Sequence, residues 1–143
     1  MIRSILVVCT GNICRSPIGE GLLRARGPAL EVSSAGVGAM VGWPADPLSV
    51  EVMQAQGHDI VAHRARQITR AMLSENDLVL TLDHHHSAWI NARFPEYRGK
   101  VHKLLRWRDN ADVPDPYRQP KAAFEESYEL IDQGVGDWLR RLG

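Results

Sequence analysis

A cysteine and an arginine lie close together near the start of the chain, at Cys9 and Arg15. A thiolate is a strong nucleophile, and a guanidinium is a planar fork that pairs with two oxygens of a phosphate group. This pair therefore suits attack on a phosphate ester. Alone, it would also fit a buried cysteine at the end of a strand and an arginine on the surface. The complete segment decides between the two, and it reads Cys9, Thr10, Gly11, Asn12, Ile13, Cys14, Arg15 and Ser16.

The segment is expected to form a loop between a strand and a helix. The apolar run from Ile2 to Val8 predicts a strand that is buried on both faces, and Pro17 predicts the first position of a helix with Ser16 as its N-cap. Backbone N–H groups turned inward in such a loop bind anions, and the positive end of the helix dipole adds to the same field. Gly11 adopts positive φ freely, and Asn12 tolerates the left-handed region. The loop is therefore predicted to bind phosphate without a metal and to stabilise a thiolate.

A second group that such chemistry needs stands far downstream, in Asp115-Pro116-Tyr117. The alcohol or phenol of a phosphate ester leaves as an oxyanion unless an acid protonates the bridging oxygen. Asp115 is the candidate for this acid. On its own the tripeptide would indicate only a turn, and the phosphate-binding segment is what gives it a catalytic interpretation.

The octapeptide from Cys9 to Ser16 resembles the phosphate-binding loop of the low-molecular-weight protein tyrosine phosphatases, and the resemblance extends over nearly the whole chain. It implies that Cys9 attacks phosphorus to give a cysteinyl phosphate, that Arg15 and the loop amides from Thr10 to Ser16 bind the phosphate, and that Asp115 serves as acid and then as base. It implies neither a cofactor nor a metal.

Two further segments are similar to family positions, Ser33-Ser34-Ala35-Gly36 and Ala62-His63-Arg64-Ala65-Arg66-Gln67. In the family the serine and the histidine hydrogen-bond to the loop asparagine. The resemblance therefore implies that Ser34 and His63 hold Asn12 in its strained conformation, and that Ser16 hydrogen-bonds to the Cys9 thiolate.

Met40 and Tyr117 are the candidates for flanking the phenyl ring of the substrate. Met40 stands where eukaryotic members carry an aromatic residue, and Arg118 stands where a second aromatic is often found. Both features resemble the bacterial branch that is associated with exopolysaccharide or capsule tyrosine kinases. The resemblance thus implies a phosphotyrosine protein as substrate, with a bacterial tyrosine kinase as the candidate partner.

Helical and strand patterns alternate along the chain, which predicts an α/β fold with a parallel sheet in a single domain, residues 1–143. The family resemblance implies three layers, with four strands in the order 2-1-3-4 flanked by helices. The remaining predicted strands are residues 31–34, 78–82 and 101–105. The predicted helices are residues 17–26, 47–56, 121–142 and one capped by Asp83 that runs through Ala92.

Composition narrows the class of protein. The chain has 143 residues, is 44% hydrophobic and carries no net formal charge, which suits a compact domain and gives no hint of nucleic acid. No apolar run predicts insertion into a membrane, and no signal peptide is indicated, so a cytoplasmic protein is expected. The two cysteines fit a reducing compartment. Because Cys9 and Cys14 share one loop, a reversible disulfide between them is a hypothesis.

The run His84-His85-His86 invites a metal-binding interpretation. Consecutive helical side chains fan out about 100° apart and do not converge on one ion. We therefore expect a solvated turn of helix here.

Two other functions remain open from the sequence. An arsenate reductase of the same fold would need two more cysteines to relay the oxidation, whereas this chain has only Cys14 besides Cys9. A phosphotyrosine-binding module without turnover would bind phosphotyrosine and release no phosphate.

Overall fold

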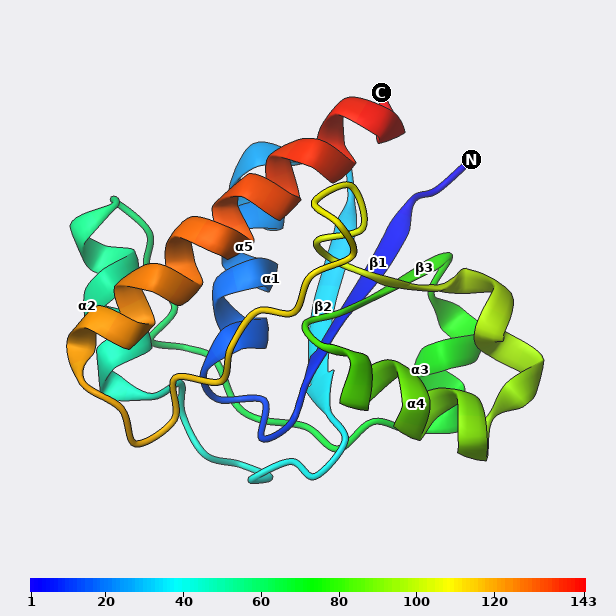
Figure 1. Ribbon diagram of the computed structural model, residues 1–143, viewed down its shortest axis with the longest axis horizontal. Coiled ribbons are helices and arrows are strands. Elements are labelled where there is room, and N and C mark those ends of the chain that lie inside the picture. Colours follow the sequence, from blue (N-terminus) through cyan, green and yellow to red (C-terminus); the bar gives the residue numbers. More distant parts are fainter.

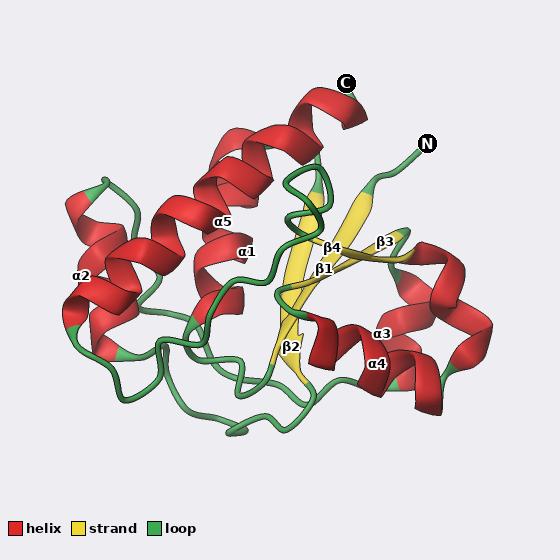
Figure 2. Ribbon diagram, viewed as in Figure 1, coloured by secondary structure: helices red, strands yellow, loops and turns green.

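Four parallel strands form the centre of the molecule (Figures 1 and 2). The computed structural model describes all 143 residues. The strands are β1 (Ser4–Cys9), β2 (Glu31–Gly36), β3 (Leu78–Thr81) and β4 (Val101–Lys103). They are paired in the order β2-β1-β3-β4, and every pair is parallel. The predicted sheet and its strand order are confirmed.

Helices cover both faces of this sheet. The helices α1 (Arg15–Arg26) and α5 (Lys121–Leu142) cover one face, and α2 (Pro47–Ala55) packs against both of them on that side. The helices α3 (Arg70–Glu75) and α4 (His84–Arg93) pack on the other, followed by the 3-10 helix η1 (Pro95–Lys100). The three-layer α/β architecture expected from the sequence is therefore present.

Strand β1 separates two hydrophobic cores. Ile5 and Val7 point into the larger core with α1 and α5, whereas Leu6 and Val8 point into the smaller core beneath α3 and α4. All four side chains are fully buried. Side chains alternate along a strand, so one apolar run supplies both cores. Because both of its faces are buried, β1 is a rigid support for the loop that follows it.

The first helix begins earlier than its sequence pattern predicts. It starts at Arg15 rather than Pro17, and its N-cap is Cys14, which makes no side-chain capping bond. The prediction that Ser16 is the N-cap is wrong, because its hydroxyl is engaged with other side chains of the loop. The N-cap assigned to Asp83 is correct, since its carboxylate accepts from the backbone N–H groups of His85 and His86.

Several other boundaries differ from their predictions. The strand expected at residues 101–105 ends at Lys103, and the one expected at 31–34 continues to Gly36. Helix α3 and the 3-10 helix η1 were not predicted, since both are too short to show a helical period. Helix α5 has the predicted bounds. None of the helices is both long enough and apolar enough to cross a membrane.

Candidate active site

The segment from Cys9 to Ser16 lies at the carboxyl ends of the strands. Cys9 is the last residue of β1, and Arg15 is the first residue of α1. Between them the chain forms a tight loop, with Cys9 opposite Gly36 at the end of β2. Ligands of open parallel sheets bind at this edge, where the strand order reverses. The fold thus places the cysteine and the arginine where a ligand is expected.

The carbonyl groups of this loop all point away from its centre and accept hydrogen bonds from surrounding segments. The six carbonyls from Cys9 to Cys14 accept, in chain order, from Val37 N, Gly38 N, Met40 N, His63 Nε2, Asp46 N and Ser49 Oγ. The backbone N–H groups of residues 10–14 donate to no protein atom. A run of N–H groups left free in this way is an anion-binding nest. The loop therefore offers several hydrogen-bond donors to one small anion.

Asn12 holds the bend of the loop in a strained conformation. Its φ is 59°, in the left-handed region, and its side chain is fully buried. The Nδ2 group donates to Ser16 Oγ at 2.7 Å and to Ser34 Oγ at 3.0 Å, while Oδ1 accepts from Arg66 N at 2.8 Å. His63 Nε2 lies 2.6 Å from the Asn12 carbonyl oxygen. The structure thus brings Ser34 and His63 against Asn12, and these bonds offset the backbone strain.

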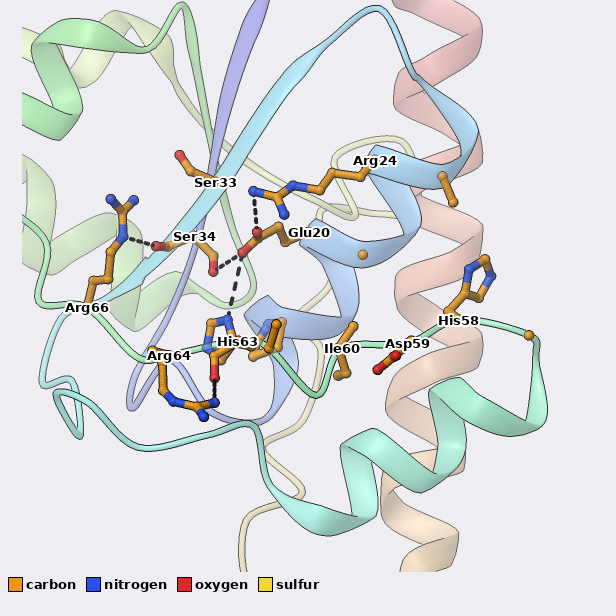
Figure 3. A pocket seen from close by; sticks show the side chains of 15 residues that line it. Glu20, Arg24, Ser33, Ser34, His58, Asp59, Ile60, His63, Arg64 and Arg66 are labelled. Carbon is orange, nitrogen blue, oxygen red and sulfur yellow. Dashed lines mark hydrogen bonds and ion pairs between the residues drawn. The ribbon is translucent and has the colours of Figure 1, made fainter.

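A carboxylate behind the loop fixes the direction of these hydrogen bonds. Ser34 Oγ donates to Glu20 Oε1, and Figure 3 shows both side chains beside His63. Because the Ser34 proton goes to Glu20, its oxygen accepts from Asn12, whose second amide proton goes to Ser16. The Ser16 hydroxyl proton is then left for Cys9 Sγ, 2.9 Å from Ser16 Oγ. The network is therefore built to place a donor on a Cys9 thiolate.

Glu20 was not singled out from the sequence. A glutamate on a helix is common, and only the three-dimensional contacts distinguish this one. It lies at the edge of a polar cavity of about 670 Å³, which is separate from the phosphate-binding loop.

The two cysteines of the loop differ in their surroundings. Both are buried and free. Burial raises the pKa of the Cys14 thiol, and the carboxylate of Asp46 raises it further. Cys14 is therefore a protonated thiol at neutral pH, whereas Cys9 is the one beside a hydroxyl donor.

Arg15 is buried rather than solvated, with 2% of its side chain exposed. Its Nη1 donates to Asp83 Oδ2 at 2.8 Å and to the carbonyl oxygen of Val113 at 2.7 Å. Burial by itself raises the pKa of Asp83, but the hydrogen bond from Arg15 and the nearby charges outweigh it and lower that pKa overall. A charged Asp83 therefore holds the guanidinium in place. The sequence predicted Asp83 only as a helix cap, and it fills both roles with its two oxygens.

One histidine of the run at the start of α4 belongs to the site. His84 and His85 are exposed, as expected, but His86 is buried and its Nε2 lies 2.9 Å from Thr10 Oγ1. The prediction of a solvated turn is wrong for His86. The reason is the helical period, because the third residue of the run faces inward toward the loop.

Asp115 and Tyr117 lie across from the loop. They line a cavity of about 130 Å³ together with Cys9 and Met40, and its other walls are Thr10, Gly11, Ile13, Cys14, Arg15 and Gly38. Asp115 Oδ2 is 3.9 Å from Arg15 Nη2, and half of the Asp115 side chain is exposed. Asp115 Oδ1 accepts from Tyr117 N at 3.0 Å, which ties the two residues together. The cavity therefore joins an anion nest, a thiol and a carboxyl group to two larger side chains.

A parallel α/β sheet with a buried cysteine and a buried arginine around an anion nest defines the class of α/β proteins with a thiol-bearing anion site. The model of the family described as low molecular weight phosphotyrosine protein phosphatase matches residues 4–143. The chain belongs to this family, and it is a protein-tyrosine-phosphatase.

Individual relatives are similar to this chain over nearly the full length of both proteins. The chain is 47% identical to the probable low molecular weight protein-tyrosine-phosphatase EpsP of Ralstonia nicotianae, over 99% of this chain and 97% of that protein. It is similar to the tyrosine phosphatase Wzb of Escherichia coli K30 in complex with sulphate, with 43% identity, complete coverage of both chains and a TM-score of 0.97. It is also similar to Vibrio vulnificus Wzb in complex with benzylphosphonate, with 40% identity, 99% coverage of each chain and a TM-score of 0.95.

Proposed function

We propose that this chain hydrolyses phosphotyrosine in proteins through a cysteinyl-phosphate intermediate on Cys9. The observation that carries the proposal is the loop itself, whose free N–H groups and buried Arg15 surround the Cys9 thiol. Such a loop stabilises the oxygens of a phosphoryl group while it is transferred. Two similar structures are complexes with sulphate and with benzylphosphonate, which supports anion binding by this fold.

In the first step the Cys9 thiolate attacks phosphorus in line with the tyrosine oxygen. A sulfur–phosphorus bond forms and the bond from phosphorus to the tyrosine oxygen breaks. Asp115 gives its proton to the departing oxygen, so tyrosine leaves as a neutral phenol. Arg15 and the loop N–H groups stabilise the equatorial oxygens. Met40 and Tyr117 flank the phenyl ring in the cavity.

In the second step Asp115, now ionised, takes a proton from water. The hydroxide attacks phosphorus, the sulfur–phosphorus bond breaks, and inorganic phosphate is released. Cys9 returns as a thiolate, which the Ser16 hydroxyl stabilises at 2.9 Å. No electron transfer and no metal enters either step.

We assign the enzyme to the cytoplasm, because a reactive cysteine loop with two free thiols suits a reducing compartment.

Met40 and Arg118, the two positions at which the chain resembles the bacterial branch of the family, support a tyrosine kinase of polysaccharide production as the partner. A kinase tail phosphorylated on tyrosine, offered beside an unrelated phosphotyrosine peptide, tests the partner, and equal kcat/KM for both would contradict it.

The function is tested by phosphate release from p-nitrophenyl phosphate in excess chelator. Hydrolysis that the chelator leaves unchanged supports the proposal. Binding of a phosphotyrosine peptide without phosphate release would instead show a binding module. Arsenate reduction with a thiol donor, in the absence of phosphatase activity, would show the reductase.

Replacement of Asp115 by Asn removes the acid and should slow substrates according to their leaving group. Phenyl phosphate has a poor leaving group and should lose about 10²- to 10⁴-fold in kcat, because the phenolate then departs unprotonated. p-Nitrophenyl phosphate should lose far less in its first step. Burst kinetics, which separate the first step from the second, measure both losses. An equal loss of the first-step rate for both esters would contradict the acid role.

Replacement of Cys14 by Ser tests the disulfide hypothesis. Peroxide oxidises the Cys9 thiolate to a sulfenic acid, and the Cys14 thiol then condenses with it to a disulfide and water, which protects Cys9. We expect the parent to regain most of its own untreated activity after dithiothreitol, and the variant to regain much less of its own. Mass spectrometry should find the disulfide in the parent. Equal recovery of the two proteins would remove the hypothesis.

A further inference from the structure

The buried His86 lies against the site, and the proposed mechanism gives it no step. Its ring touches Thr10 at the start of the loop and Arg15 at its end. Only 1% of His86 is exposed. A buried ring between two residues of the phosphate site influences how both are oriented.

The protonation of the ring follows from its neighbours. Backbone N–H groups only donate, and the N–H of Asp83 lies 3.2 Å from His86 Nδ1 within the capping box of α4. Nδ1 therefore accepts, and the single proton of a neutral imidazole is on Nε2. The opposite tautomer would turn an N–H toward another N–H, and the two contacts that would favour it, Asp83 Oδ1 to Nδ1 and Arg15 Nη2 to Nε2, are each longer, at 3.5 Å. The first turn of α4 thus selects the tautomer.

The ring is neutral at pH 7. Burial, the largest cause, and the Arg15 guanidinium together lower the pKa of His86 to about 4, although the carboxylates of Asp83 and Asp115 act against them. His85, on the same helix, adds a small lowering contribution. A proton on Nδ1 would also break the bond from Asp83 N.

The tautomer decides where the Thr10 hydroxyl proton points. With its proton on Nε2, His86 donates to Thr10 Oγ1 at 2.9 Å, and Arg15 Nη2 also donates to that oxygen at 3.4 Å. Both lone pairs of the hydroxyl are then used, and its own proton is free. Thr10 lines the same cavity as Cys9 and Arg15. In the other tautomer the hydroxyl would donate to His86 and present no proton to the cavity.

We infer that His86 is a positioning residue that turns the Thr10 hydroxyl into a hydrogen-bond donor for the bound phosphate. This inference rests on the proposed phosphatase function. It adds a side-chain donor to the backbone nest at the mouth of the cavity. It also makes the first turn of α4 a part of the phosphate site through its cap.

Nitrogen-15 NMR of the histidine rings tests the tautomer in the full chain. At pH 7, long-range nitrogen–proton correlations should show His86 neutral with its proton on Nε2, assigned by the loss of its signals in His86→Gln. A charged ring or a proton on Nδ1 would overturn the inference, whether or not the protein proves to be active.

Substitution then tests the role. Glutamine suits the third position of a helix as a capping-box acceptor, so His86→Gln keeps the cap and removes the rigid imidazole that donates to Thr10. Loss of one hydrogen bond predicts a fall of about 3- to 12-fold in kcat/KM for phenyl phosphate and in affinity for inorganic phosphate. His85→Gln is the matched control, since His85 is the exposed neighbour, and both values should stay within about twofold of the parent.

A double substitution separates positioning from a purely structural role. If His86 acts through Thr10, His86→Gln should add little to the loss already caused by Thr10→Val, less than about twofold. The inference would be overturned if the loss in kcat/KM of the double variant equalled the product of the two single losses. It would also be overturned if His86→Gln had the kcat/KM of the parent. An inactive parent would refute the proposed function instead, and the tautomer and the phosphate affinities would still test His86.

Discussion

Replacement of Cys9 by Ser should abolish turnover and leave phosphate binding intact. A serine hydroxyl stays protonated where the thiolate is stable, and the neighbouring Ser16 hydroxyl offers a donor at 2.9 Å rather than a base. We expect a loss of at least about 10⁴-fold in kcat. The loop N–H groups and Arg15 remain, so a phosphotyrosine peptide should still bind.

Two measurements check this result. Phosphate release is followed for parent and variant with p-nitrophenyl phosphate, and peptide affinity is followed by calorimetry. Trapping with acid should recover a phosphorylated chain from the parent and none from Cys9→Ser. A variant that keeps more than about a tenth of the parent rate would show that another group attacks phosphorus.

Replacement of Gly36 by Ala should disrupt the phosphate loop from behind. A Cβ on Gly36 would lie 2.3 Å from the Thr10 carbonyl oxygen and 3.0 Å from Asn12 N. Both contacts are to backbone, so no side-chain rotation relieves them. The loop must move, and a shift of about 1 Å at a catalytic site costs on the order of 10²-fold in rate. Overpacking of this kind also costs about 1 to 3 kcal/mol of stability.

Gly99→Ala provides the control for that substitution, because a Cβ there meets nothing within 4 Å and the residue is far from the loop in η1. Thermal unfolding and kcat/KM are measured for both variants. Gly99→Ala should match the parent in both. Parent-like kcat/KM in Gly36→Ala would show that the loop tolerates displacement, and would contradict the requirement for close approach.

The parts of the site that lie together in the sequence were predictable from it. The loop from Cys9 to Ser16 was predicted between a strand and a helix, and the alternating pattern predicted the parallel sheet. Helix α5 was predicted with its bounds because it is long and strongly amphipathic. The order of the strands came from the family resemblance rather than from spacing.

The missed parts depend on contacts between distant segments. Glu20 and Asp83 each carry ordinary sequence signals, and only folding places Glu20 beside Ser34 and Asp83 beside Arg15. His86 was assigned to solvent with its neighbours, and the helical period of α4 offered a signal that its side chain faces elsewhere. Ser16 fits an N-cap by type, but the loop uses its hydroxyl for Cys9 instead.

The hydrogen bonds that fasten the loop carbonyls bear on how substrate preference changes in this fold. Val37, Gly38, Met40 and Asp46 each hold the loop through backbone N–H groups, and the same stretch carries Met40 in the wall of the cavity. The bonds to the loop carbonyls therefore do not require particular side chains at Val37, Gly38 and Met40, but they do require a stretch of this length. Retargeting by point substitution leaves the donors in register, whereas an inserted or deleted residue would move them away from their acceptors. The stretch from Val37 to Asp46 can thus change substrate preference through substitutions in the cavity wall, but not through a change in its length.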